Sequence, residues 1–268
     1  MVEKKNLKFD FIIIKPVFKL SLFNQIPFNT STAFVHSNED GLIALNKEVG
    51  VLSHPNAKGD MSKALLVAEF DLKKECYHWC DAEGEQRMLW LVNRLDAPTS
   101  GLILLATSLE LKNALRKSFE SRLVEKEYFA VVRGRPRVKK GVWSGMIRSH
   151  LSQSKTPSQS SFAKTIYEVD VCSESMPKLS RLKLNPITGR THQLRIHCAD
   201  HHLPIVGDQT YGDFKLNRSI KRLTKVSRLM LHCSALKVSY SLKGQEKQIL
   251  AKVPLPESFK TLIAVSYT

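Results

Sequence analysis

Cysteine is scarce in this sequence, with five in 268 residues. An odd number of cysteines at irregular spacing does not suggest a disulfide framework, so we expect free thiols and a cytoplasmic protein. Cys76, His78 and Cys80 lie close together and could suggest a metal site. Zinc sites, however, usually pair two such groups of ligands, and a second group at matching spacing is missing. We therefore expect ordinary packing in this segment and no bound metal.

Long apolar runs are also lacking. The run Phe9–Ile14 ends at Lys15-Pro16, which makes it too short for a signal peptide or a membrane span of about 20 residues. Glu3 and Asp10, together with the absence of arginine near them, argue against a transit peptide. We expect no association with a membrane.

Two common catalytic signatures are absent as well. The sequence contains no Gly-rich phosphate-binding loop and no Gly-x-Ser-x-Gly nucleophile turn. His192 and His197 are five residues apart, so they do not share a helical face as the i, i+4 pairs of zinc sites do. We favour hydrogen bonding, structural or to RNA, for these histidines over metal binding.

Negative charge is in short supply. Lysine and arginine number 41 against 25 aspartates and glutamates, which gives a net charge of +16. Such an excess suggests a polyanionic partner, either nucleic acid or an anionic membrane, and we favour nucleic acid. Basic residues gather at Arg133–Lys140 and Lys215–Arg228, where they could bind phosphates.

The chain divides into an N-terminal extension, residues 1–40, and one domain, residues 41–268. The extension holds a possible strand at Phe9–Ile14 and a Ser/Thr/Asn-rich link at Asn29–Ser37. Strands outnumber helices in the rest, and hairpins replace regular βαβ alternation, which predicts an α+β domain. We expect strands at 42–45, 102–106, 125–134, 163–171, 180–185, 229–231, 235–240 and 248–253. We expect helices at 61–80, from the capping box 107–110 onward, at 191–200 and within 254–264, and a mobile polar loop at Ser152–Ser161.

One segment, LVNRLDAPTSGLILLAT at residues 91–107, stands out. It places Asp96 between Arg94 and a Pro-Thr-Ser-Gly turn that leads into an apolar strand. Asp, Pro and Gly all weaken strands, so the turn is expected to present Asp96 and Arg94 at the edge of a sheet. The alternative is a turn aspartate that bonds its own backbone. A single carboxylate is too few for a glycosidase pair, but beside an arginine it could act as nucleophile or base.

Four segments in order carry a resemblance to a known family. They are GLIALNKEVGVLSHPN, LVNRLDAPTSGLILLAT, EKEYFAVVRG and PITGRTHQLRIHCADHHLPIVGDQTYG. Together they resemble the motifs of the RluA-type pseudouridine synthases, and the resemblance extends over about Gly41 to Leu236. The resemblance implies a pseudouridine synthase fold, with a mixed, largely antiparallel central sheet flanked by helices and loops.

The resemblance also implies roles for particular residues. Asp96 matches the essential aspartate, which attacks the ribose C1′ or abstracts a ribose proton. Arg195 matches the arginine that forms a salt bridge with it, and Tyr128 the tyrosine that stacks on the target base and could help to deprotonate C5. Arg94 matches the arginine that replaces the flipped-out uridine in the RNA. The other residues expected at the RNA-binding surface are Asn93, Arg190, His192, Lys47 and His54.

Two positions depart from the family pattern. Asn93 stands where the family has histidine, and Glu48 stands where it has proline. Asn93 can form hydrogen bonds but cannot titrate. Because Asp96, Arg94, Tyr128 and Arg195 all remain, we expect activity to survive. Residues 1–40 are too few and too poor in arginine for the small RNA-binding domain of many relatives.

The sequence therefore predicts an isomerase that converts uridines in structured ribosomal or transfer RNA to pseudouridine. This rearrangement takes place within one site, so no metal or organic cofactor is expected, and nothing in the sequence demands a partner subunit, so we expect a monomer. Two alternatives remain open: an RNA-binding protein without catalysis on the same fold, and a metal-dependent nuclease built on the histidines.

Overall fold

The computed structural model describes residues 25–148, 160–174 and 176–264. The possible strand at Phe9–Ile14 and most of the polar loop at Ser152–Ser161 lie outside the described residues.

The elements within these ranges are mostly strands. The strands are β1 (Thr32–Ser37), β2 (Leu42–Lys47), β3 (Glu69–Asp71), β4 (Cys76–Cys80), β5 (Gln86–Leu91), β6 (Ser100–Ala106), β7 (Val124–Arg133), β8 (Lys140–Ile147), β9 (Ser161–Cys172), β10 (Leu179–Pro186), β11 (Leu231–Leu242) and β12 (Gln245–Lys252). The helices are the 3₁₀ helix η1 (Lys58–Lys63) and the α-helices α2 (Leu109–Glu120), α3 (Gln193–Asp200), α4 (Phe214–Thr224) and α5 (Ser258–Ala264).

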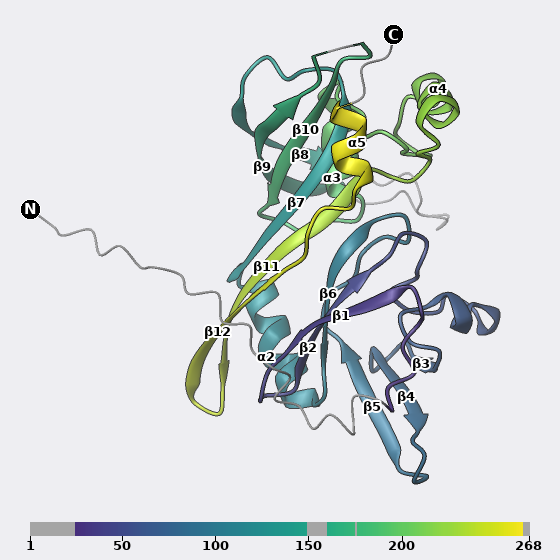
Figure 1. Ribbon diagram of the computed structural model, residues 1–268. Coiled ribbons are helices and arrows are strands. Elements are labelled where there is room, and N and C mark those ends of the chain that lie inside the picture. The colour runs from purple at the N-terminus through teal and green to yellow at the C-terminus, as the bar shows by residue number, and fades with distance from the viewer. Residues whose placement is uncertain (1–24, 149–159, 175, 265–268) are drawn as a thin grey trace, which may run out of the picture.

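All twelve strands join one sheet, in the order β3-β4-β5-β6-β11-β7-β10-β9-β8, with β2 also on β6, β1 on β2 and β12 on β11. The pairing of β6 with β11 is parallel, and the other strand pairings of the described residues are antiparallel. The expected mixed, largely antiparallel sheet with flanking helices is therefore confirmed. In Figure 1 the long strands β7 and β11 run through the middle of the molecule, between the β1–β6 half and the β8–β10 half.

The two halves have separate hydrophobic cores. The first core lies under β2, β6 and α2, and the second joins β7 and β10 to α3, α4 and α5. Tyr128 on β7 packs against both cores. The seam between the cores is therefore marked by one of the residues singled out for catalysis.

Local patterns explain the elements that were predicted correctly. Strand β6 carries an unbroken apolar run and is buried throughout its length, as is typical of a strand covered on both faces. The Ser108 hydroxyl caps α2 by accepting from the Leu111 amide at 3.2 Å, one residue later than the predicted cap at Thr107. Leu111 and Leu115 then form the buried face of that helix.

The helix predicted over residues 61–80 is wrong. This segment contains the end of η1, a bridge at Ala64, and strands β3 and β4, which pair as a hairpin through Phe70 and Tyr77. Leu72, expected on the apolar face, lies in the hairpin turn and is 65% exposed. Alternating aromatic residues in β4 pack across the strands, and this pairing prevails over the helical spacing of the leucines.

The link predicted at Asn29–Ser37 is also wrong. Most of it is strand β1, which pairs with β2 in antiparallel register from Thr32 opposite Lys47 to Ser37 opposite Ile43. Threonine, phenylalanine and valine within TAFVHS favour a strand despite the polar composition around them. Residues 32–37 of the expected extension are therefore part of the sheet.

Candidate active site

Asp96 lies in the turn between β5 and β6. Hydrogen bonds to backbone groups of the turn hold the residues around it. The Leu95 amide donates to the Ser53 hydroxyl (3.0 Å), which donates in turn to the Leu95 carbonyl (2.7 Å). The turn is closed by the backbone of Asp96, whose carbonyl accepts from the Thr99 amide at 2.9 Å. This leaves the carboxylate, which is 30% exposed, for contacts outside the turn.

Gly101 lets β6 approach β11 directly after this turn. Its φ is +113°, and a Cβ at this position would lie 2.2 Å from the Cys233 carbonyl oxygen. Gly101 and Cys233 are partners in the parallel pairing of β6 and β11. A glycine is therefore needed where the Asp96 turn enters the sheet.

Two side chains from the start of α3 meet the carboxylate of Asp96. Arg195 Nη1 lies 3.3 Å from Asp96 Oδ2, and His192 Nε2 lies 3.5 Å from the same oxygen. His192 is the N-cap residue of α3 and has a left-handed φ of 56°. Burial lowers the pKa of His192, although the charge of Asp96 opposes the shift. Asp96 and Arg195, which the resemblance paired in a salt bridge, are thus in contact although they come from distant segments, and His192, expected at the RNA-binding surface, lies beside the same carboxylate.

Asp208 holds Arg195 in place. Its two carboxylate oxygens accept from Nε and Nη2 of Arg195, both at 2.8 Å, and Thr210 accepts from Nη2 at 3.1 Å. The backbone amides of Thr210 and Tyr211 also donate to Asp208. Burial would raise the pKa of Asp208, but the hydrogen bonds from Arg195 and these amides outweigh it and hold the pKa below its usual value. The guanidinium is therefore paired and aimed before any substrate arrives.

Tyr211 completes this network. Its hydroxyl lies 3.0 Å from His192 Nδ1, and its ring lies under the Arg195 guanidinium, 5.2 Å from centroid to carbon. Such a cation–π contact adds to the pairing with Asp208. Tyr211 therefore touches both side chains that meet Asp96.

Tyr128 is on β7, opposite Cys233 of β11. Burial raises the pKa of Tyr128 well above its usual value, and the Cys233 thiol and Asp96 add to the shift. The phenol is therefore protonated at neutral pH. An aromatic ring in this position suits stacking against a base better than proton abstraction.

Lys47 is fully buried, so its burial does not support the expected contact with RNA. Its ammonium donates to the carbonyls of Glu48 (3.0 Å), Val51 (2.8 Å) and Ala97 (3.0 Å). The Ala97 carbonyl also accepts from the Gly50 amide at 2.8 Å. Lys47, the last residue of β2, thus bonds to the backbone of the residue after Asp96. Burial lowers the pKa of Lys47 to about 7.

Asn93 is half-buried and bonds to the backbone of β6. Its Oδ1 accepts from the Leu104 amide at 2.8 Å, and its Nδ2 donates to the Leu102 carbonyl at 3.5 Å. The side chain continues the β5–β6 pairing beyond the last paired residue of β5. This local role accounts for an amide at this position without any contact with RNA.

Arg94, His54 and Arg190 lie nearer the surface. Arg94 is exposed and its Nη1 lies 3.3 Å from His54 Nε2, while the His54 ring stacks on Phe70 at 4.9 Å. Arg190 is exposed, and its Nε donates to the Phe162 carbonyl at 3.2 Å. The arginine side chains of this group are accessible to a polyanion.

Asp208, Thr210 and Tyr211 were missed by the sequence analysis. A usable signal was present, because Asp208 directly follows the apolar residues Ile205 and Val206 and a glycine, much as Asp96 follows Leu95. A carboxylate at the end of a buried segment needs a partner, and Arg195 was available.

The described residues offer neither a metal centre nor a membrane helix. Within residues 25–148, 160–174 and 176–264, no cluster of three or more histidine, cysteine, aspartate or glutamate side chains could hold a metal ion. No helix in the same ranges is long and apolar enough to cross a bilayer.

Known proteins match the part of the chain that contains Asp96 and Arg195. The RNA pseudouridylate synthase family profile matches residues 41–200, more than half of the chain. The chain is 32% identical over 231 residues to tRNA pseudouridine synthase C of Pectobacterium carotovorum, covering 81% of this chain and 58% of that protein. It is 34% identical over 230 residues to tRNA pseudouridine synthase C of Haemophilus ducreyi, covering 80% of this chain and 88% of that protein.

Solved structures show the same fold. Human RNA Pseudouridylate Synthase Domain Containing 4 has a TM-score of 0.60 at 24% identity, covering 85% of this chain and 90% of that one. Human RNA Pseudouridylate Synthase Domain Containing 1 has a TM-score of 0.58 at 20% identity, covering 88% and 96%. The chain spans between about half and nine-tenths of the length of the curated relatives it matches. With the family profile and these relatives together, the chain belongs to the RNA pseudouridylate synthase family.

Proposed function

We propose that this protein converts specific uridines of structured ribosomal or transfer RNA to pseudouridine, with Asp96 as the catalytic carboxylate. The observation that carries the proposal is the partly exposed Asp96 held by Arg195 and His192. Both contacts fall on Oδ2. Oδ1 is then the oxygen that faces the ribose, either to attack C1′ or to take up a ribose proton.

The bonds of the reaction balance within one nucleotide. The bond from C1′ to N1 of the uracil breaks, the base turns, and a bond from C1′ to C5 forms. The C5 hydrogen leaves as a proton and N1 gains one, so no oxidant, reductant or group donor is consumed. Asp96 acts as an anion in either role, and the Arg195 guanidinium lies beside its carboxylate.

The target uridine has to leave its stack before C1′ can be reached. Arg94 is exposed beside His54 and Phe70, and its planar guanidinium would fill the gap in the RNA. Tyr128 would stack on the extruded uracil in the seam between the two cores. Burial raises the pKa of Tyr128, which favours stacking over proton abstraction as its role.

Substitution of the carboxylate tests the proposal. We expect Asp96→Asn to lower turnover by about a thousandfold or more, because the amide keeps the shape but loses the charge. The assay is release of tritium from transfer and ribosomal RNA transcripts labelled at uracil C5. Asp71→Asn, at the β3–β4 turn, is the matched control.

The outcomes separate the alternatives. Undiminished release by Asp96→Asn contradicts the role of Asp96. RNA binding without any release by the wild-type protein from total cellular RNA favours an RNA-binding protein without catalysis. Strand cleavage that stops with a chelator would indicate a nuclease.

A further inference from the structure

The basic side of α4 is not used by the proposed chemistry. Lys215, Arg218, Lys221, Arg222 and Lys225 all belong to α4 or its C-cap, and all five are exposed. At 3.6 residues per turn they fall within about a third of the helix circumference. Within the described part of the chain, none of the five forms an ion pair.

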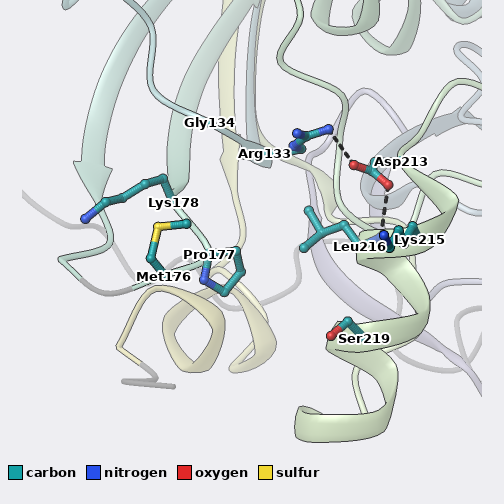
Figure 2. Close-up of a pocket in the computed structure, with 9 residues that line it drawn as sticks. All are labelled: Arg133, Gly134, Met176, Pro177, Lys178, Asp213, Lys215, Leu216 and Ser219. Carbon is teal, nitrogen blue, oxygen red and sulfur yellow. Dashed lines mark hydrogen bonds and ion pairs between the residues drawn. The ribbon is translucent and has the colours of Figure 1, made fainter. Parts of the chain in front are cut away.

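Two open cavities lie along this helix. One, of about 360 Å³, is lined by Arg218, Lys221, Arg222 and Lys225 alone. The other, of about 510 Å³, lies between the N-terminal half of α4 and the segments around Gly134 and Pro177 (Figure 2). Lysine and arginine side chains therefore contribute to the lining of both cavities, and their positive charge suits a chain of phosphates.

The basic side also contains an aromatic residue. Phe214 begins α4, is 53% exposed, and lies in the same sector as the five cations. An exposed aromatic ring among cations is typical of surfaces that bind single-stranded or looped RNA, where bases stack. Leu223, the other large exposed apolar residue of α4, is nine residues away and so lies on the opposite side. The helix therefore lacks the continuous apolar stripe that a membrane surface would need.

The helix is tied to the catalytic centre through Asn217. Asn217 Oδ1 accepts from the Gly207 amide (2.8 Å), and its Nδ2 donates to the Asp208 carbonyl (3.0 Å). Asp208 is the residue that holds Arg195. Arg133 of β7 pairs with Asp213, the N-cap of α4, at 2.5 Å (Figure 2). One connected set of hydrogen bonds thus links the basic helix to Arg195.

We propose that the basic side of α4 is a docking surface for RNA phosphates, placed at a fixed distance from Asp96 by the Asn217–Asp208–Arg195 connection. This inference rests on the proposed function, because it concerns RNA presented to the same site. The target uridine reaches Asp96 from one part of the RNA while a neighbouring part, extending beyond the modified loop, lies on α4. RNAs that are too short to reach α4 gain no binding affinity from this surface.

The test compares two variants of equal charge. In the first, Arg218, Lys221, Arg222 and Lys225 are all changed to glutamine. In the matched control, Lys73, Lys117, Arg122 and Lys243, which are exposed elsewhere, are changed to glutamine. Binding of fluorescein-labelled transfer RNA transcript is measured across a salt series, with thermal unfolding to confirm that each variant is folded.

The first variant should bind the transcript at least about tenfold more weakly than the control near physiological salt. Its slope of log affinity against log salt should fall by about 1 for each phosphate that the variant no longer neutralises. In tritium release, KM for the transcript should rise while kcat stays unchanged, and a stem-loop of about 15 nucleotides should show no difference. Phe214→Ala should weaken binding without changing the slope, since stacking releases no counterions.

Equal affinities and slopes for the two charge variants would overturn the proposal. So would an α4 effect seen only with phosphatidylglycerol vesicles, which would assign the surface to a membrane. Failure of the proposed function is a separate result: wild-type protein would then release no tritium, while the α4 effect on binding could still be measured.

Discussion

At the scale of single residues, Asp208 determines where the charge beside Asp96 lies. Asp208 is 1% exposed and accepts from Arg195 through both oxygens, and Arg195 in turn donates to Asp96. Asp208 therefore acts through Arg195 as a positioning residue. Its loss would leave a buried guanidinium without its main partner, which is costly in a protein interior.

We expect Asp208→Asn to lower the free energy of unfolding by about 3–5 kcal/mol and to lower kcat with little change in KM. Urea denaturation and tritium release measure the two effects. Asp170→Asn is the control, because Asp170 is exposed and its pairing with Arg181 should contribute at most about 1 kcal/mol. A destabilised Asp208→Asn protein with normal kcat would show that Asp208 serves the fold alone.

Lys47 gives a pH-dependent prediction. Burial lowers its pKa from 10.5 to about 7, so between pH 7 and pH 10 the unfolded chain binds a proton that the folded chain has released. The free energy of unfolding of the wild type should then rise with pH across this window. The free-energy cost of burying the charged form of Lys47 should be fully present below pH 7. We expect the difference in the free energy of unfolding between wild type and Lys47→Met to change by up to about 4 kcal/mol across the window.

Chemical denaturation at several pH values, with Lys74→Met as an exposed control, measures this change. A difference that stays constant from pH 7 to pH 10 would mean that Lys47 keeps its proton, held by the carbonyls of Glu48, Val51 and Ala97.

At the scale of elements, the contact between β6 and β11 depends on one glycine. We expect Gly101→Ala to destabilise the protein by about 2–4 kcal/mol, since the new Cβ would meet the Cys233 backbone and the φ of +113° disfavours alanine. Activity should fall as well, because the Asp96 turn leads directly into this pairing. Gly145→Ala on β8, where a Cβ meets nothing within 4 Å, is the control. Equal stability of the two variants would contradict this reasoning.

Elements with strong local signals were predicted well from the sequence. The capped start of α2 and the apolar run of β6 are both local patterns, and both were found close to their predicted places. The segment 61–80 failed because its leucines have helical spacing, whereas its structure is decided by pairing with β5. Such a pairing partner is not visible in a local window.

At the scale of the whole molecule, the site forms where two halves meet. Asp96 comes from the first half, Arg195 from the second, and Tyr128 lies on the seam. The sequence brought these three together only through the family resemblance, since nothing local relates residues 99 positions apart. Asp208 was missed because the apolar segment before it indicates that the carboxylate needs a partner but not which side chain the folded chain brings to it.

The distribution of charge is also a property of the whole chain. The net charge of +16 predicted a polyanionic partner, and the family to which the chain belongs has RNA as its named substrate class. The sequence could not show that the cations at 215–225 would share one side of a helix tied to Asp208. That arrangement depends on where α4 begins and which of its faces is buried.

The parallel pairing of β6 with β11 has a consequence for synthesis on the ribosome. Ser100 and its partner His232 are separated by 132 residues, which take roughly 7–26 s to translate at about 5–20 residues per second. For much of that interval the growing chain carries Asp96 without Arg195, and for all of it an apolar strand edge lacks its neighbour. The nascent protein is inactive until its last third emerges, and it has an exposed strand edge that a chaperone would need to shield.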